Sequence, residues 1–171
     1  GMRWQPSLQI IPHYESEPLY INSLKNSLEK KISELGWEPD LIVASYHGIP
    51  KKYFSKGDPY HCYCQKTSRL LSEKFKKIPI KTTFQSRFGP QEWLQPYTDK
   101  TLESLPKEGK KNILVICPGF SSDCVETLEE ISIQGKESFI KNGGKNFDVV
   151  PCLNDNDDHI ALLQHLAEKF I

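Results

Sequence analysis

The sequence has no excess of charge of either sign and no apolar run long enough to cross a membrane. Lys and Arg number 22 and Asp and Glu number 22 in 171 residues, so the formal net charge is zero. A chain without a net positive field has no general electrostatic attraction for nucleic acid or for an anionic membrane surface. Its apolar stretches are of strand length, so neither a signal peptide nor a transmembrane helix is predicted.

The sequence also lacks a regular cysteine framework and a glycine-rich phosphate loop. Five cysteines, an odd number with irregular spacing, indicate reduced thiols in a cytoplasmic protein. Neither G-x-G-x-x-G nor G-x-x-x-x-G-K-[ST] follows any predicted strand, and the turn at residues 12–15 contains no glycine. A phosphate cradle for a nucleotide is therefore not expected.

What the sequence does contain is a regular alternation of strand-like and helical segments. The predicted strands are 8–11, 41–46, 80–85, 113–117 and 147–150. The predicted helices are 18–35, 61–76, 99–105, 123–141 and 157–170. Five such pairs predict one α/β domain over residues 1–171, with a doubly wound, mostly parallel sheet and helices on both faces. Ligands of such sheets bind at the carboxyl ends of the strands.

A row of acidic side chains follows the fourth predicted strand. The predicted polar stripe of this helix, with spacings of 3, 4 and 4, consists of Asp123, Glu126, Glu130 and Gln134. The predicted apolar face consists of Val125, Leu128, Ile131 and Phe139. Asp123 and Glu126 also match a capping-box pattern at the helix start. The stripe is thus either a functional row of carboxylates or a helix cap followed by solvated surface charges.

The ends of two other predicted strands offer different chemistry to the same edge. His47 follows the second strand, where it either faces Glu126 across a site or is a hydrogen-bonded structural histidine. After the third strand, the planar fork of Arg87 suits a ligand carboxylate, and Phe88 and Trp93 suit a planar aromatic ligand. The alternative is that Arg87 pairs with a nearby acid and Trp93 anchors the loop.

Four segments together resemble ferrochelatase. They are residues 45–50 (SYHGIP), 57–60 (GDPY), 84–89 (FQSRFG) and 118–130 (PGFSSDCVETLEE). The match runs through the whole chain in the order of the family and is most similar to its Gram-negative bacterial branch. It covers the C-terminal half of that enzyme, without the N-terminal half. The resemblance implies a lyase that inserts Fe²⁺ into protoporphyrin IX to give protohaem, the last step of haem synthesis.

The resemblance also implies roles for individual residues, carried over by motif. His47 and Glu126 are expected to be catalytic. The metal is expected to contact His47, Glu126 and Glu130. The substrate-binding residues are expected to be Phe120, Trp93, Arg87 and Tyr46. Cys124 stands where some relatives have a histidine.

The implied ligands and partners follow from the same resemblance. Ferrous iron is a substrate, and no tightly bound cofactor is expected; the chain ends at Ile171 without a cysteine-rich extension, so no iron–sulfur cluster is expected either. The expected partners are protoporphyrin IX, Fe²⁺, the missing N-terminal half and, by peripheral contact, the inner membrane, but not nucleic acid. Two alternatives remain: another tetrapyrrole chelatase, acting on sirohydrochlorin or cobalt, and a non-catalytic porphyrin- or haem-binding domain. A passive binder would not need the acidic pair Glu126 and Glu130.

Overall fold

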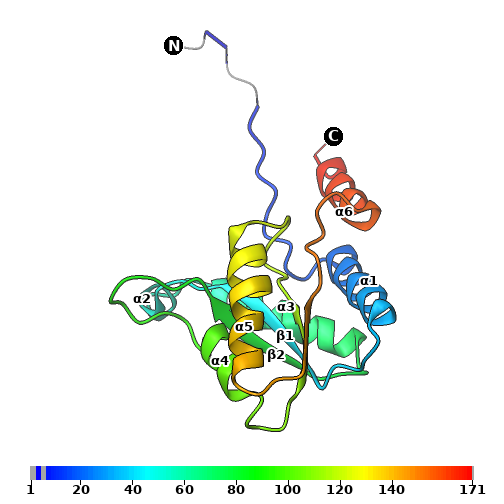
Figure 1. Ribbon diagram of the computed structural model, residues 1–171. Helices are drawn as coiled ribbons and strands as arrows, with labels where there is room; N and C mark the ends of the chain where they lie inside the picture. Colours follow the sequence, from blue (N-terminus) through cyan, green and yellow to red (C-terminus); the bar gives the residue numbers. More distant parts are fainter. Residues whose placement is uncertain (1–2, 5–6, 171) are drawn as a thin grey trace.

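The computed structural model describes residues 3–4 and 7–170 and shows a parallel sheet between two layers of helices (Figure 1). The strands are β1 (Leu41–His47), β2 (Ile80–Gln85), β3 (Asn112–Ile116) and β4 (Asn146–Val149). The helices are α1 (Pro18–Glu34), α2 (Lys51–Ser55), α3 (Tyr60–Lys74), α4 (Thr98–Ser104), the π-helix η1 (Glu126–Gly135), α5 (Lys136–Lys141) and α6 (Asp157–Glu168). All strand pairs are parallel, in the order β2-β1-β3-β4, which confirms the predicted fold class. None of the described helices is both long enough and apolar enough to cross a membrane.

Alternate side chains of β1 point to opposite faces of the sheet, as the strand period requires. Ile42, Ala44 and Tyr46 belong to the hydrophobic core under α1, α3 and α6. Leu41 and Val43 belong to the second core, under α4, η1 and α5. Ser45 and His47 continue this second set, so the His47 side chain lies on the face that η1 covers.

The strand order reverses between β1 and β3. The chain passes from β1 outward to β2 on one side, and then returns to place β3 and β4 on the other side of β1. In open α/β sheets a crevice forms at this switch point, beyond the carboxyl ends of the two strands. His47 ends β1, and Phe120 follows β3, so two predicted site residues flank this point.

The predicted helix 123–141 begins later than expected and is wider in its first part. It starts as η1, with Val125 as N-cap, and continues directly into α5 (Figure 1). A π-helix bonds residue i to residue i+5, so an apolar face counted at the α-helical period loses its phase. Ile131 and Phe139 are buried as predicted, but Val125 and Leu128 are 67% and 54% exposed. Their assignment to the buried face was wrong.

The predicted strand at 8–11 was also wrong. The structure describes these residues as irregular chain, leading away from the body of the domain (Figure 1). The side chains of Leu8 and Ile10 are 85% and 78% exposed. Alternating apolar residues form a strand only where a neighbouring strand takes up their backbone hydrogen bonds, and the β2-β1-β3-β4 sheet does not extend to this segment. The sequence prediction also missed the short helix α2.

Candidate active site

His47 has a fixed ring orientation at the end of β1. Its Nδ1 atom lies 2.6 Å from the carbonyl oxygen of Gly48. A carbonyl oxygen can only accept a hydrogen bond, so Nδ1 carries the proton and donates it. In the neutral ring this leaves a lone pair on Nε2, for which the described residues supply no hydrogen-bond partner. The His47 side chain is therefore set up to accept a proton or to bind a metal through Nε2.

The turn after His47 needs glycine because the chain approaches β2 closely. The N–H of Gly48 donates to the carbonyl oxygen of Gln85 at 2.7 Å. A Cβ atom at position 48 would lie 2.8 Å from that oxygen and 3.2 Å from Cε3 of Trp93. On the other side, the hydroxyl of Tyr60 donates to the His47 carbonyl at 2.8 Å. The backbone around His47 is thus held from β2 and from α3.

Glu126, the first residue of η1, is close enough to His47 for the charges of the two side chains to interact. Hydrogen bonding by the Cys124 side chain lowers the pKa of Glu126, and the backbone N–H of Glu126 and the positive charge that His47 carries when protonated act in the same direction. Glu126 is therefore an ionised carboxylate at neutral pH. The aromatic ring of Phe120 lies on the β3 side of the site, 6.3 Å from the His47 ring between centroids. The structure thus brings together His47, Glu126 and Phe120.

Gln85 connects β1, which ends at His47, to η1, which begins at Glu126. It is paired with His47 in the β1–β2 register, so the two side chains point to the same face. Its buried amide accepts a hydrogen bond from Ser45 at 2.7 Å and donates one to the Glu126 carbonyl oxygen at 2.7 Å. One side chain therefore spans β1, β2 and the first turn of η1.

Asp123 is not the helix cap that the capping-box pattern predicted. Its carboxylate accepts hydrogen bonds from the hydroxyl of Thr127 at 3.0 Å, the amide of Asn154 at 2.8 Å and the backbone N–H of Cys152 at 3.3 Å. Burial alone would raise the pKa of Asp123, but these hydrogen bonds lower it overall. Asp123 thus ties the loop before η1 to the loop after β4.

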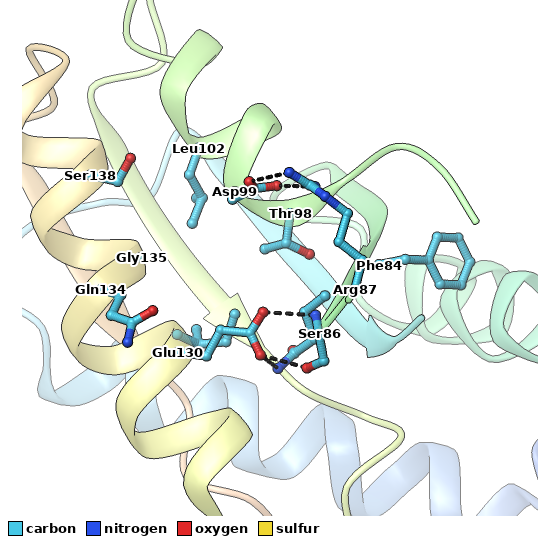
Figure 2. Close-up of a pocket in the computed structure, with 12 residues that line it drawn as sticks. Phe84, Ser86, Arg87, Thr98, Asp99, Leu102, Glu130, Gln134, Gly135 and Ser138 are labelled. Carbon is cyan, nitrogen blue, oxygen red and sulfur yellow. Dashed lines mark hydrogen bonds and ion pairs between the residues drawn. The ribbon is translucent and has the colours of Figure 1, made fainter. Parts of the chain in front are cut away.

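A cavity of about 280 Å³ lies between β2, α4 and η1 (Figure 2). Both carboxylate oxygens of Glu130 face its wall at Ser86: Oε1 accepts from the Ser86 backbone N–H at 2.7 Å, and Oε2 accepts from the Ser86 hydroxyl at 2.5 Å. Gln134 lines the cavity further along η1, whereas His47 and Glu126 are not among the lining residues. Glu130 therefore lies in a hollow beside the His47–Glu126 site.

Arg87 forms an ion pair with Asp99 in this structure. Its guanidinium forms two parallel hydrogen bonds with Asp99, at 2.7 and 2.8 Å (Figure 2). It also lies 4.1 Å from the centroid of the Tyr97 ring. A bidentate pair of this kind occupies the fork that a ligand carboxylate would use. The substrate-binding role of Arg87 stays a prediction, and the geometry agrees with the alternative of an internal ion pair.

Trp93 and Tyr46 are both buried. Trp93 is 6% exposed, donates from Nε1 to the Phe88 carbonyl oxygen at 3.0 Å and forms a β-bridge with Pro50. Tyr46 is 2% exposed and lies on the opposite face of the sheet, with its hydroxyl 2.9 Å from that of Ser68. Their predicted contacts with a substrate stay predictions. In this structure Trp93 holds the loop after β2 against the domain.

The metal ligands also stay predictions. Among the described residues, no group of three or more His, Cys, Asp and Glu side chains converges on one point. His47 and Glu126 lie close enough for their charges to interact, while Glu130 is engaged by Ser86. The structure thus offers two adjacent donor groups, one imidazole nitrogen and one carboxylate.

Sequence reasoning gave no role to Gln85, Ser86 or the Cys124 thiol. A signal for Gln85 was available, because a polar residue in the last position of a buried strand needs a buried partner. Ser86 gave no signal, since its contact with Glu130 depends on a backbone φ of +63°. Cys124 was considered only as a replacement for a histidine, although its thiol contributes to lowering the pKa of Glu126.

Comparison with known proteins gives matches over nearly the whole chain. The model of the family described as ferrochelatase matches residues 1–170. The ferrochelatase of Rhizobium meliloti (strain 1021) is 57% identical over 170 residues, which are 98% of this chain and 50% of that protein. The ferrochelatase of Allorhizobium ampelinum is 55% identical over 98% of this chain and 49% of its own length.

A third relative, the ferrochelatase of Rhizobium etli (strain CIAT 652), is 54% identical over 99% of this chain and 50% of its own length. The chain thus spans about half the length of the curated relatives it matches. Because the matches to the family model and to the relatives cover nearly the whole chain, the chain belongs to the ferrochelatase family.

Proposed function

We propose that this chain supplies the acid–base and metal-handling part of a lyase that inserts Fe²⁺ into protoporphyrin IX to give protohaem. The observation that carries the proposal is the pairing at the switch point of the sheet. There His47 has its Nδ1 proton bonded to Gly48 and its Nε2 lone pair available, and Glu126 is close enough for the charges of the two side chains to interact. This is an arrangement for moving protons and for receiving a divalent cation.

The reaction requires the removal of two protons from the pyrrole nitrogens as Fe²⁺ binds to the four ring nitrogens. Both protons leave to solvent, and the ring loses two positive charges as the metal brings two. Imidazole is the side chain best suited to accept such a proton near neutral pH. We assign this acceptor role to Nε2 of His47, with Glu126 stabilising the imidazolium that forms.

Glu126 also suits a brief contact with the incoming metal. Carboxylate and imidazole are both acceptable ligands for Fe²⁺. Two adjacent donors bind a hydrated ion less tightly than a closed set of three or four, so the ion can pass on to the porphyrin. The lowered pKa of Glu126 keeps this donor ionised over the neutral pH range.

We further propose that the other half of the enzyme covers the outer face of η1. The relatives are about twice as long as this chain. Val125, Leu128 and Ile133 are 67%, 54% and 54% exposed and lie together along a groove on that face. Exposed apolar groups gathered in this way mark a protein contact. The proposed docking surface is therefore the outer face of η1.

A metallation assay tests the proposal. Protoporphyrin IX and Fe²⁺, or Zn²⁺ as a more stable substitute, are added anaerobically to the full-length protein, and the change in porphyrin absorbance is followed continuously. We expect turnover by the full-length protein and much slower or no turnover by the 171-residue chain, because the ring has to be held from two sides. Porphyrin binding without metallation by the full-length protein would identify a passive binder. Metallation of sirohydrochlorin alone would identify a different chelatase.

A further inference from the structure

The contacts of Glu130 use both of its carboxylate oxygens inside the protein. Oε1 accepts from the Ser86 backbone N–H, and Oε2 accepts from the Ser86 hydroxyl, with the Gln85 amide 3.5 Å away (Figure 2). One residue of the loop after β2 thus binds the carboxylate through two of its atoms. A side chain held in this way is less available as a metal ligand than the spacing of the acidic row suggested.

The backbone of Ser86 is in a conformation that residues with a Cβ atom seldom adopt. Its φ is +63°, in the left-handed region, where such residues persist when surrounding contacts stabilise them. Here the conformation directs the N–H and the hydroxyl of Ser86 at the same carboxylate. The contact with Glu130 is therefore a specific feature of this loop.

A second contact from the same strand end holds the first turn of η1. The Gln85 amide donates to the Glu126 carbonyl oxygen at 2.7 Å and is itself fixed by Ser45, which is on the strand of His47. Gln85 and Ser86 thus bind η1 at two points one helical turn apart. The first of these points is the carbonyl group of Glu126 itself, so the contact fixes the backbone that carries the Glu126 side chain.

From these contacts we propose that Ser86 and Gln85 are positioning residues, and that Glu130 is the anchor through which Ser86 acts. Together they dock η1 on the end of β2 and so keep the Glu126 carboxylate beside His47. This inference rests on the proposed function, because it assigns the anchor a part in metallation. It gives Glu130 a different role from that of a direct ligand for Fe²⁺, and the two roles predict different kinetics.

The test is a double-mutant cycle in the full-length protein, with Ser86→Ala, Glu130→Ala and the double variant. If Ser86 acts through Glu130, each single substitution lowers kcat by about 10- to 100-fold because Glu126 is misplaced. The KM for Fe²⁺ stays within about twofold of the wild-type value. The kcat of the double variant is no lower than that of the less active single variant, since both substitutions break the same contact.

Two further variants control the cycle. Glu137→Ala removes a glutamate of the same charge from an exposed position on α5, which continues η1, and we expect it to leave kcat and KM unchanged. Ser86→Asn should restore most of the activity lost in Ser86→Ala, because asparagine tolerates a positive φ and its amide donates a hydrogen bond. The proposal would be overturned if Glu130→Ala alone raised the KM for Fe²⁺ and if the two single effects multiplied in the double variant, because Glu130 would then be a metal ligand.

A measurement independent of catalysis separates the anchor from the reaction. Amide hydrogen exchange at Ser86 should be slow in the wild-type protein and faster in Glu130→Ala, which removes the acceptor of the Ser86 N–H, whichever reaction the protein carries out. Unchanged exchange in this variant overturns the anchor while leaving the proposed function intact. A wild-type protein that binds porphyrin but never metallates it overturns the proposed function, and with it the positioning role, even if the exchange data support the contact.

Discussion

The Nδ1 atom of His47 lies 2.6 Å from the carbonyl oxygen of its neighbour Gly48, so the ring is held by its own turn. This contact leaves Nε2 as the reactive nitrogen and leads to a direct prediction. His47→Ala in the full-length protein should lower metallation by about 10²- to 10⁴-fold, the usual contribution of a general base.

Porphyrin affinity, measured by fluorescence quenching, should stay close to that of the wild type, because His47 acts mainly in the transition state. His165→Ala is the matched control, since this histidine is on α6, with 42% of its side chain exposed. Wild-type turnover by His47→Ala would leave His47 with a structural role alone.

The second prediction concerns the Cys124 thiol, whose hydrogen bond lowers the pKa of Glu126. Cys124→Ala should move this pKa back up toward the ordinary value for glutamate. A carboxylate needed in its ionised form is lost as pH falls through its pKa, so the acidic limb of the metallation profile should shift to higher pH. The measurement is the metallation rate as a function of pH. Cys62→Ala removes an exposed thiol elsewhere and should leave the profile in place; a shift toward lower pH in Cys124→Ala would contradict the assignment.

The third prediction concerns the turn at Gly48. In Gly48→Ala the new methyl group would lie 2.8 Å from the backbone oxygen of Gln85, which cannot easily move away. We expect a loss of about 1–3 kcal/mol in the free energy of unfolding, as for other overpacked positions, together with reduced metallation. Urea unfolding measures the first effect. Gly36→Ala is the control, since nothing lies within 4 Å of its Cβ position, and an equal loss there would show that the close approach is unimportant.

The fourth prediction tests the docking surface on η1. Leu128→Asp in the 171-residue chain should change the free energy of unfolding by less than about 0.5 kcal/mol, because the side chain is exposed there. In the full-length protein the same substitution should be destabilising by about 1.5–3 kcal/mol, the value of one buried leucine side chain. Ile160→Asp, at a residue of α6 that is 50% exposed, is the control. Equal effects of Leu128→Asp in the two proteins would place the contact elsewhere.

Most of the fold could be predicted from the alternation of strand-length segments with helical ones, because β1 to β4 and most of the helices between them begin and end within a few residues of the predicted positions. The errors have physical reasons. The segment at 8–11 has the composition of a strand but no neighbouring strand in the described sheet. The π-helix was missed because its widened turns follow from contacts such as that of Gln85 with the Glu126 carbonyl, which lie outside the local sequence.

The candidate site was predictable in its strand ends but not in its contacts. His47 and Phe120 could be placed because parallel strands end at one edge, and Glu126 because it follows one of these strands. The partners of individual side chains could not be placed. Arg87 binds Asp99, twelve residues away, and Glu130 binds Ser86, forty-four residues away. Pairings at such separations are decided by how α4 and η1 pack on the sheet.

Asp123 has a consequence for how the family varies. Its carboxylate binds the side chain of Asn154, and the backbone N–H of Asp123 donates to the same asparagine at 2.8 Å. Asn154 has a φ of +48°, a conformation that asparagine and aspartate accept more readily than other residues with a side chain. Aspartate there would face a like charge, so a change at position 154 alone would disturb the entry to η1. We therefore expect the two positions to covary among homologous sequences, as a pair inherited together across a gap of 31 residues.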